Sequence, residues 1–197
     1  MRKRRPGDAA GITRLLETSP DVVRHKATAG ANRAEAGTYW IAEISHYIYA
    51  GDTALHIAAA AYRSKIAEEL VARGADVGAK NRRGAEPLHY AADGVPGSQE
   101  WNPEAQAETI RCLIAAGANP NAVDNSGVAP LHRAVRTRCA AAVKALLDGG
   151  ADAHARNKSG STPLLLASLQ TGRGGSGSVE AKAQQAEILK ILKRFTA

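Results

Sequence analysis

Aromatic side chains are scarce in this chain, at 4% of its 197 residues, whereas alanine is abundant. Small side chains let helices approach one another closely, which favours thin stacked helices over one thick globular centre. With 44% hydrophobic residues, the chain is long enough for one domain with a real core.

Cysteine is equally rare, with Cys112 and Cys139 as the two thiols of the sequence. Their spacing fits no metal-binding motif, and so few cysteines favour a reducing compartment, so we expect a cytoplasmic location. We expect Cys112 to be a small core residue, and Cys139, near the start of its helix, to be more exposed and able to react.

Long apolar runs are missing too. No run approaches the ~18 residues of a membrane-spanning helix. The charged start, MRKRRPGDAAG, has no apolar segment behind it and therefore does not match a secretory signal. Two interpretations of residues 2–5 stay open, a solvated and frayed terminus or a contact with nucleic acid or a membrane surface.

Acidic residues are fewer than basic ones: the chain has 19 Asp and Glu and 26 Lys and Arg, which gives a net charge of +7. This balance favours acidic proteins, nucleic acid or anionic surfaces as partners without selecting one. The sequence has no nucleophile elbow, P-loop or dinucleotide fingerprint. We therefore predict that the chain is not an enzyme and has no catalytic, cofactor-binding or metal-binding residues.

A recurring motif organises most of the chain. The segment GDTALHIAAA at 51–60 returns in altered form at 84–92, 127–135 and 160–168. Its motif leucine falls at Leu55, Leu88, Leu131 and Leu164, in steps of 33, 43 and 33 residues. An apolar stripe with helical spacing follows each motif. A second recurring segment comes after the stripe, such as RGADVGAK at 73–80. A fixed period of this length is typical of a stacked array.

The pattern G-x-T-P-L-H-x-A-A, a leucine-rich helix and then G-A-D-x-N-A resembles the ankyrin repeat, over roughly residues 48–195. The resemblance implies an all-α repeat solenoid, built from helix–turn–helix units joined by β-hairpin loops. We expect full repeats at 48–80, 81–123, 124–156 and 157–197, the last serving as a C-terminal cap. Residues 1–47 are expected to form a degenerate N-terminal capping repeat with an aromatic insertion.

The resemblance also implies a structural role for three histidines at one repeat position, His56, His89 and His132. Their spacing places them in successive layers and not around one point, and each ring can satisfy two backbone groups. Two interhelical insertions depart from the family pattern, one within 94–103 and one, rich in Gly and Ser, at 171–178.

The most aromatic stretch, TYWIAEISHYIYA at 38–50, has no counterpart in the family pattern. One interpretation is a short helix and strand that pack over the first full repeat and bury its apolar end. The other is an exposed aromatic anchor for a partner. An enzyme site around His46 is a third and weaker possibility, since no paired group accompanies it.

Partners of ankyrin proteins usually dock on the concave side, and the family's contact positions can be transferred to this chain. With Trp101 of the first insertion as an added anchor, the candidate partner-binding residues are Lys80, Arg82, Arg83, Asp93, Trp101, Arg136, Arg156 and Lys158. Six of these are basic, so the concave side is predicted to be positive. The alternative is that these loop charges are merely solvated.

The resulting functional hypothesis is a monomeric, non-enzymatic scaffold whose concave basic surface binds an acidic segment of a protein partner. A nucleic-acid-associated basic adaptor is the alternative, suggested by the sequence pI of about 9.6 and the basic start. No base-reading motif or RNA-stacking module supports that alternative. No cofactor is expected.

Overall fold

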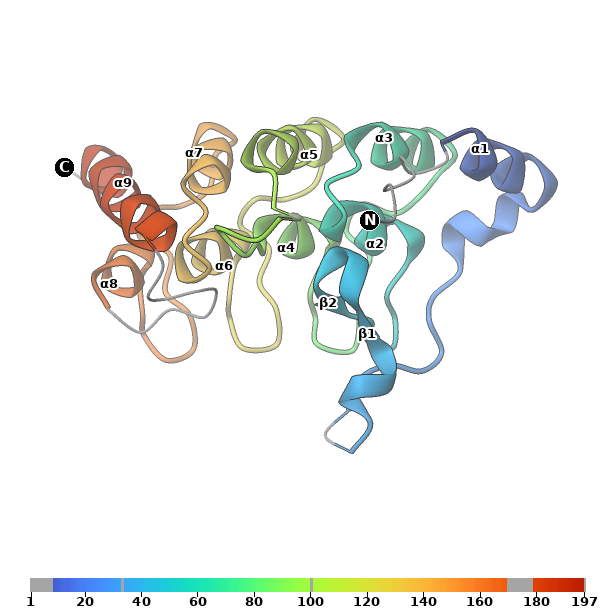
Figure 1. The fold of residues 1–197 in the computed structure, drawn as a ribbon, viewed down its shortest axis with the longest axis horizontal. Coiled ribbons are helices and arrows are strands. Elements are labelled where there is room, and N and C mark those ends of the chain that lie inside the picture. Colours follow the sequence, from blue (N-terminus) through green and yellow to red (C-terminus); the bar gives the residue numbers. More distant parts are fainter. Residues whose placement is uncertain (1–8, 33, 100, 170–178, 197) are drawn as a thin grey trace.

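The computed structural model describes residues 9–32, 34–99, 101–169 and 179–196. Two rows of helices lie side by side in chain order, α1, α3, α5, α7 and α9 in the outer row and α2, α4, α6 and α8 in the inner row (Figure 1). The basic start at 2–5 and the Gly/Ser insertion at 171–178 lie outside the described residues. The arrangement confirms the predicted all-α repeat solenoid.

The helices pair along the chain, one inner and one outer helix at a time. After α1 (Ala9–Thr18), the pairs are α2 (Ala54–Ala60) with α3 (Ser64–Ala72), α4 (Pro87–Ala92) with α5 (Pro103–Ala115), α6 (Pro130–Arg136) with α7 (Ala140–Asp148), and α8 (Pro163–Ser168) with α9 (Val179–Thr196). Each inner helix contacts the next inner helix, and α3, α5, α7 and α9 follow the same rule in the outer row. The division of the chain into repeats at the boundaries given above stays our interpretation.

Local sequence signals start the inner helices. Pro87, Pro130 and Pro163 each occupy the first turn, where a missing backbone N–H costs no hydrogen bond. The motif leucines place the core in successive layers, because Leu55 and Leu88 are fully buried and Leu131 is 1% exposed. Leu164, in the last layer, is partly buried against the same core.

The loops that join α3 to α4, α5 to α6 and α7 to α8 all project to the same side (Figure 1). We call residues 81–84, 124–127 and 157–160 the tips. Backbone hydrogen bonds link them, since Asn125 N–H donates to Arg83 O at 2.9 Å and Lys158 N–H donates to Ser126 O at 3.1 Å. The spacing is so tight that a Cβ added to Gly127 would lie 2.8 Å from the Lys158 nitrogen. The tips therefore form one continuous edge.

The N-terminal end of the array is covered by α1 and the 3-10 helix Pro20–Arg24. Leu16 and Val23, each 2% exposed, supply the apolar contacts. This corrects the first interpretation of 38–50, because the aromatic segment does not cover the apolar end of the first repeat.

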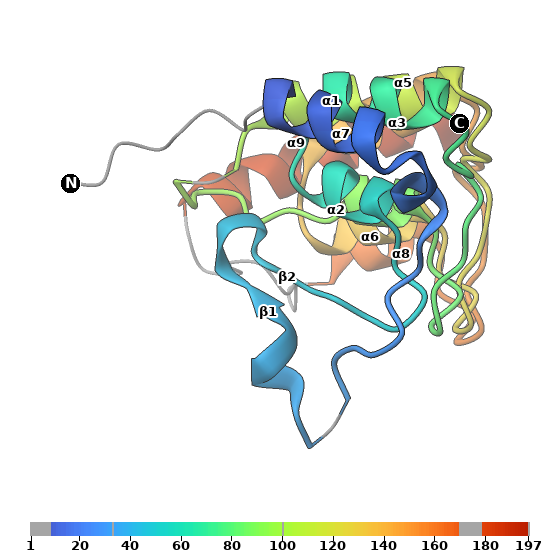
Figure 2. The ribbon, with the colours of Figure 1, turned by 90° about the vertical axis from the view of Figure 1, so that its right-hand side faces the viewer.

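The aromatic segment forms a small antiparallel hairpin, with β1 (Trp40–Ile41) paired to β2 (His46–Tyr47) and 3-10 turns at Ala36–Tyr39 and Ala42–Ile44. Figure 2 shows it beneath the inner helices, across from the row of tips. The hairpin therefore lies on the concave side. It consists of strands and 3-10 turns and not of the predicted helix and strand.

Candidate functional site

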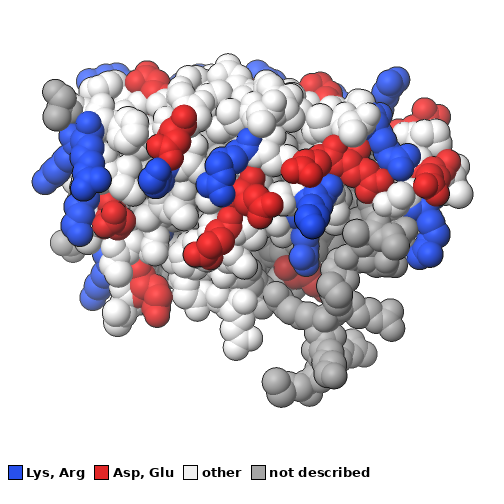
Figure 3. Space-filling model, turned by 90° about the horizontal axis from the view of Figure 1, so that it is seen from above, with Lys and Arg blue, Asp and Glu red and all other residues white. Residues whose placement is uncertain are grey.

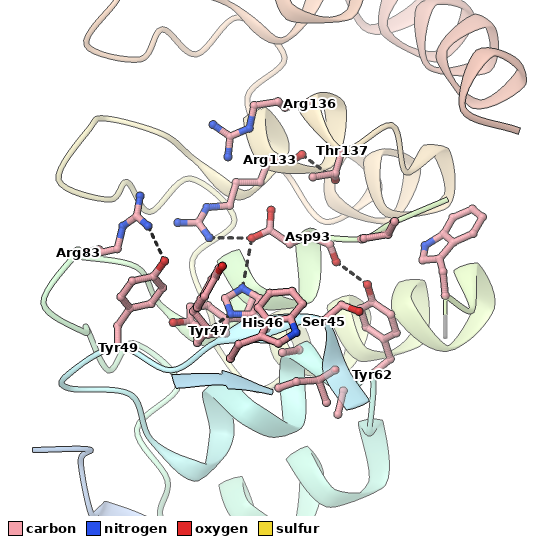
Figure 4. A pocket seen from close by; sticks show the side chains of 18 of the residues that line it. Ser45, His46, Tyr47, Tyr49, Tyr62, Arg83, Asp93, Arg133, Arg136 and Thr137 are labelled. Carbon is pink, nitrogen blue, oxygen red and sulfur yellow. Dashed lines mark hydrogen bonds and ion pairs between the residues drawn. The ribbon is translucent and has the colours of Figure 1, made fainter. Parts of the chain in front are cut away.

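The hairpin encloses a groove on the concave side, with a volume of about 430 Å³. We call it the hairpin groove: one side is formed by residues 40–49 and the other by the C-terminal ends of α4 and α6, with residues 94, 95, 98 and 101 of the loop after α4. In Figure 4, His46, Tyr47 and Tyr49 lie on the hairpin side and Arg133, Arg136 and Thr137 on the α6 side. A cavity of this size is in the range that holds small ligands or a few side chains of a partner.

His46 attaches the hairpin to α4. Its ring stacks on Tyr90 with centroids 4.0 Å apart, and its Nε2 lies 3.6 Å from Asp93 Oδ2. Its Nδ1 donates to the Tyr47 carbonyl at 2.8 Å. Both ring nitrogens are therefore directed at acceptors, which explains the position of the ring without a catalytic role.

Asp93 and Asp124 both accept hydrogen bonds from the guanidinium group of Arg133 at the base of the groove. Arg133, 7% exposed, donates from Nη1 to Asp93 at 2.9 Å and from Nη2 to Asp124 at 3.1 Å. Burial would raise the pKa of Asp93, but the Arg133 charge and the contact with His46 outweigh it and hold that pKa well below its usual value. The pKa of Asp124 is also lowered, because hydrogen bonds from the Val128 and Ser126 N–H groups and from Arg133 outweigh burial.

The three motif histidines are structural, as predicted. In each, Nδ1 accepts the N–H of the residue before its helix, Thr53, Glu86 or Ala129, at 3.1–3.2 Å. In each, Nε2 donates to a carbonyl of the next layer: Ala85 for His56, Val128 for His89, and Ala155 and Ser161 for His132. Burial lowers all three pKa values, that of His89 to about 4 with the nearby Arg133 charge contributing. The neutral ring is thus the folded form.

Cys139 is not the exposed, reactive thiol that the sequence suggested. It is fully buried at the start of α7, and its Sγ contacts Thr137. Burial raises its pKa to about 12, which removes the thiolate needed for reactivity. Cys112 is partly buried on α5, with Sγ 3.7 Å from the Ser64 carbonyl.

The described residues hold no group of three or more His, Cys, Asp or Glu side chains that could bind a metal ion. Within the same ranges, no helix has both the length and the apolar character needed to span a membrane. The outer helices, seen in Figure 3, show Lys and Arg interspersed with Asp and Glu. That outer face has no single sign of charge.

Comparison of the sequence with models of known protein families identifies the family to which the chain belongs. Models of the ankyrin repeat match residues 50–82 and 83–125, and a model of multiple ankyrin repeats matches 113–167. The chain is an ankyrin-repeat protein. Ankyrin repeats generally mediate protein–protein interactions, and the family is generally non-enzymatic.

This ankyrin-repeat protein is similar to segments of much larger relatives. It is 41% identical over 98 residues to the Neurogenic locus Notch protein of Drosophila melanogaster, covering 47% of this chain and 4% of the relative. It is 35% identical over 127 residues to the B-cell lymphoma 3 protein homolog of Mus musculus, and 35% over 114 residues to Ankyrin repeat and SOCS box protein 16 of Mus musculus. These alignments cover 59% and 57% of this chain, and 26% and 24% of the relatives.

The candidate basic residues of this ankyrin-repeat protein fall into three groups, at or beside the loops that join the repeats, in contact with the N-terminal segment, and in the lining of the hairpin groove. Arg156 and Lys158 are exposed beside and in the last tip, where their side chains donate to the backbone carbonyls of Gly160 and Asn125. The side chain of Lys80 is 58% exposed, and its Nζ lies 3.7 Å from Glu86 Oε1.

Arg82 and Arg83 also contact the N-terminal segment. Arg82 donates to the Ala31 carbonyl, and Arg83 donates to the Tyr49 hydroxyl at 2.9 Å. Both guanidinium groups lie over the Tyr49 ring, at 5.7 and 4.9 Å from its centroid. The family's contact positions in the second repeat therefore already bind part of the chain itself.

The remaining candidates line the hairpin groove, namely Asp93, Trp101 and Arg136. Asp93 forms the internal ion pair with Arg133, and Trp101 is partly buried, with Nε1 donating to Gln106 at 2.9 Å. Arg136, partly buried at the end of α6, lies close enough to Asp93 for its charge to lower the pKa of that carboxyl.

The candidate list from the sequence omitted Arg133, and it weighed the aromatic stretch 38–50 as a partner anchor without placing its tyrosines beside the second repeat. Arg133 follows the motif histidine of the third repeat, so a charged residue on a predicted inner helix next to a buried position was a usable signal. The approach of Tyr47 and Tyr49 to the second repeat had no such signal, because no local pattern encodes a contact between distant segments.

Proposed function

We propose that this protein binds an acidic segment of a protein partner across its tips and the adjoining concave side. The observation that carries the proposal is the charge of the tips and their flanking residues. Lys80, Arg82, Arg83, Arg156 and Lys158 are exposed there. Asp124, the acidic residue within residues 81–84, 124–127 and 157–160, is 8% exposed and bound to Arg133, whereas the exposed Asp76 and Asp152 lie elsewhere in the joining loops.

The geometry supports a binding role for these charges. The backbone links between tips hold the cations on one edge, so an extended chain could contact several of them at once. Electrostatic complementarity of this kind accelerates association and disfavours basic partners. Because the pairs would be solvent-exposed, their contribution should fall with rising salt concentration.

A selection from a library of random peptides displayed on phage tests the proposal. Peptides selected by the wild-type protein should be enriched in Asp and Glu. The double variant Arg156→Glu/Lys158→Glu should weaken their binding by about tenfold or more, since two attractive contacts become repulsive. These two residues are chosen because they do not contact the N-terminal segment.

The matched control is Lys182→Glu/Lys193→Glu, which makes the same change of charge at exposed positions of α9. It should leave peptide binding nearly unchanged. Selected peptides without acidic enrichment, or equal losses in both double variants, would argue against the tips as the binding surface. A salt-dependent shift of labelled RNA or DNA that exceeds peptide binding would favour the nucleic-acid alternative instead.

A further inference from the structure

The hairpin groove combines apolar surface and positive charge in one cavity. Trp40 of β1 is 43% exposed and Val95 of the loop after α4 is 39% exposed, and both line the groove with the partly buried Trp101. Arg83 and Arg136 line it as well. Exposed large apolar side chains that gather in one cavity are typical of a binding site.

The two aspartates inside the groove are already engaged. Asp93 and Asp124 both accept from Arg133, and Asp93 also lies beside His46. Arg83 makes its hydrogen bond to a neutral phenol, that of Tyr49. Glu43, exposed on the hairpin, is the other acidic residue of the described lining. An incoming carboxylate would therefore meet Arg83 and Arg136 and not an unbound aspartate.

We propose that the hairpin groove binds a partner segment in which a bulky apolar side chain stands among carboxylates. The apolar side chain enters between Trp40 and Val95, while the carboxylates contact Arg83 and Arg136. This inference rests on the proposed function and specifies the partner's chemistry. The tips supply attraction to negative charge, and the groove adds a requirement for one large apolar residue.

The hairpin is what creates this requirement. Without residues 40–49 the ends of α4 and α6 would face solvent, and the concave side would discriminate by charge alone. The groove of about 430 Å³ exceeds one side chain, so it can hold the apolar residue with neighbouring backbone. The insertion thus adds specificity to a scaffold whose other contacts are electrostatic.

The test uses fluorescein-labelled nine-residue peptides composed of Asp, Glu and Ser, with Leu, Phe, Trp or Ala at the centre. Fluorescence anisotropy measures their binding to the full chain. At least one bulky apolar peptide should bind wild-type protein about tenfold or more tightly than the Ala peptide, because its side chain leaves water. This ratio is the measured quantity, because it separates the groove from the tips.

Two variants on opposite walls should each bring the ratio close to one, Val95→Asn and Trp40→Ala. Val179→Asn is the matched control, because Val179 is 81% exposed at the start of α9, away from the groove lining. It should leave the ratio unchanged. Thermal unfolding of every variant verifies that the array is intact. Two variants are used because Trp40 contacts Tyr47, so its loss could also disturb the hairpin.

The outcomes separate this inference from the proposed function. If all four peptides bind equally and Arg156→Glu/Lys158→Glu weakens them equally, the groove inference is wrong and the acidic-partner proposal stands. If the tip variant has no effect but Val95→Asn still abolishes the ratio, the groove inference stands and the tip proposal fails. A ratio that survives Val95→Asn, or no binding of any peptide, overturns the inference.

Discussion

At the scale of single residues, Arg133 connects the two adjacent layers that line the hairpin groove. It is almost fully buried and binds carboxylates from the end of α4 and from the tip before α6. A buried cation held by one buried and one partly buried carboxylate is stable only while its partners are present. The site therefore depends on a residue whose signal in the sequence was its place on an inner helix, directly after the buried motif histidine His132.

Replacing Arg133 by glutamine should destabilise the protein by about 3 kcal/mol or more, because the buried Asp124 and the partly buried Asp93 would both lose their cation. Urea unfolding followed by circular dichroism measures the loss. Arg111→Gln, at an exposed position of α5, is the control and should change stability by less than about 0.5 kcal/mol. Equal effects of the two substitutions would contradict a central role for Arg133.

The lowered pKa values of the motif histidines predict that the stability of the fold decreases as the pH falls below neutral. The pKa of His89 is about 4 in the folded state, below the ordinary 6.5, so between these values the unfolded state binds the extra proton. Its contribution to stability is complete above pH 6.5 and is lost as the pH falls toward 4. From pH 7 to pH 5 this amounts to about 2 kcal/mol for His89, with His56 and His132 acting in the same direction.

Urea unfolding at both pH values measures this loss in wild type and in His89→Gln, which should show the smaller loss. His154→Gln, in an exposed loop, should retain the wild-type loss. The lowered carboxyl pKa values of Asp93 and Asp124 do not interfere, because their contribution declines only as the pH falls below the ordinary 3.8. The histidine account fails if His89→Gln loses as much stability as wild type.

At the scale of elements, the helices could be predicted from the sequence and the hairpin could not. The inner helices have signals nearby in the chain: α4 and α6 have both a proline in the first turn and a motif histidine three residues after the capping position, α2 has the histidine and α8 the proline. The position of the hairpin depends on contacts of His46 and Tyr49 with residues of the second repeat. Such distant contacts leave no local periodicity.

Replacing His46 by alanine should loosen the hairpin while leaving the array folded. The stack on Tyr90 and the contact with Asp93 would both be lost, so hydrogen exchange at the Ile48 amide, bonded to the Tyr39 carbonyl, should accelerate by about tenfold or more. The Val143 amide, bonded to Cys139 in α7, should keep its protection. Unchanged exchange at Ile48 would mean that other contacts hold the hairpin.

At the scale of the whole molecule, stability comes from contacts between neighbouring layers, because helices contact mainly the helices of adjacent pairs. The fold class followed from the sequence because the period of the motif already implies stacking. The sequence could not show which repeat has an internal partner. The hairpin covers part of the concave side and leaves the later repeats open (Figure 1).

Core substitutions should therefore matter most in the interior layers. Leu131→Ala should cost about 3 kcal/mol, because Leu131 is 1% exposed between layers on both sides. Leu165→Ala in the last inner helix, where the side chain is 48% exposed, should cost less than about 0.5 kcal/mol. Urea unfolding compares the two variants, and similar losses would contradict a row of layers with an open end.

The turns of the tips are set by few side chains. Asn81, Asp124 and Asn157 each accept two backbone N–H groups within their own loop. Neighbouring turns are joined through main-chain atoms, so these links remain when the side chains of Asn125 and Lys158, which donate to the Arg82 and Asn125 carbonyls, are replaced. The protein could thus be redirected to new targets by randomising residues 125, 126, 158 and 159 alone, with the stacking distance between repeats left as it is.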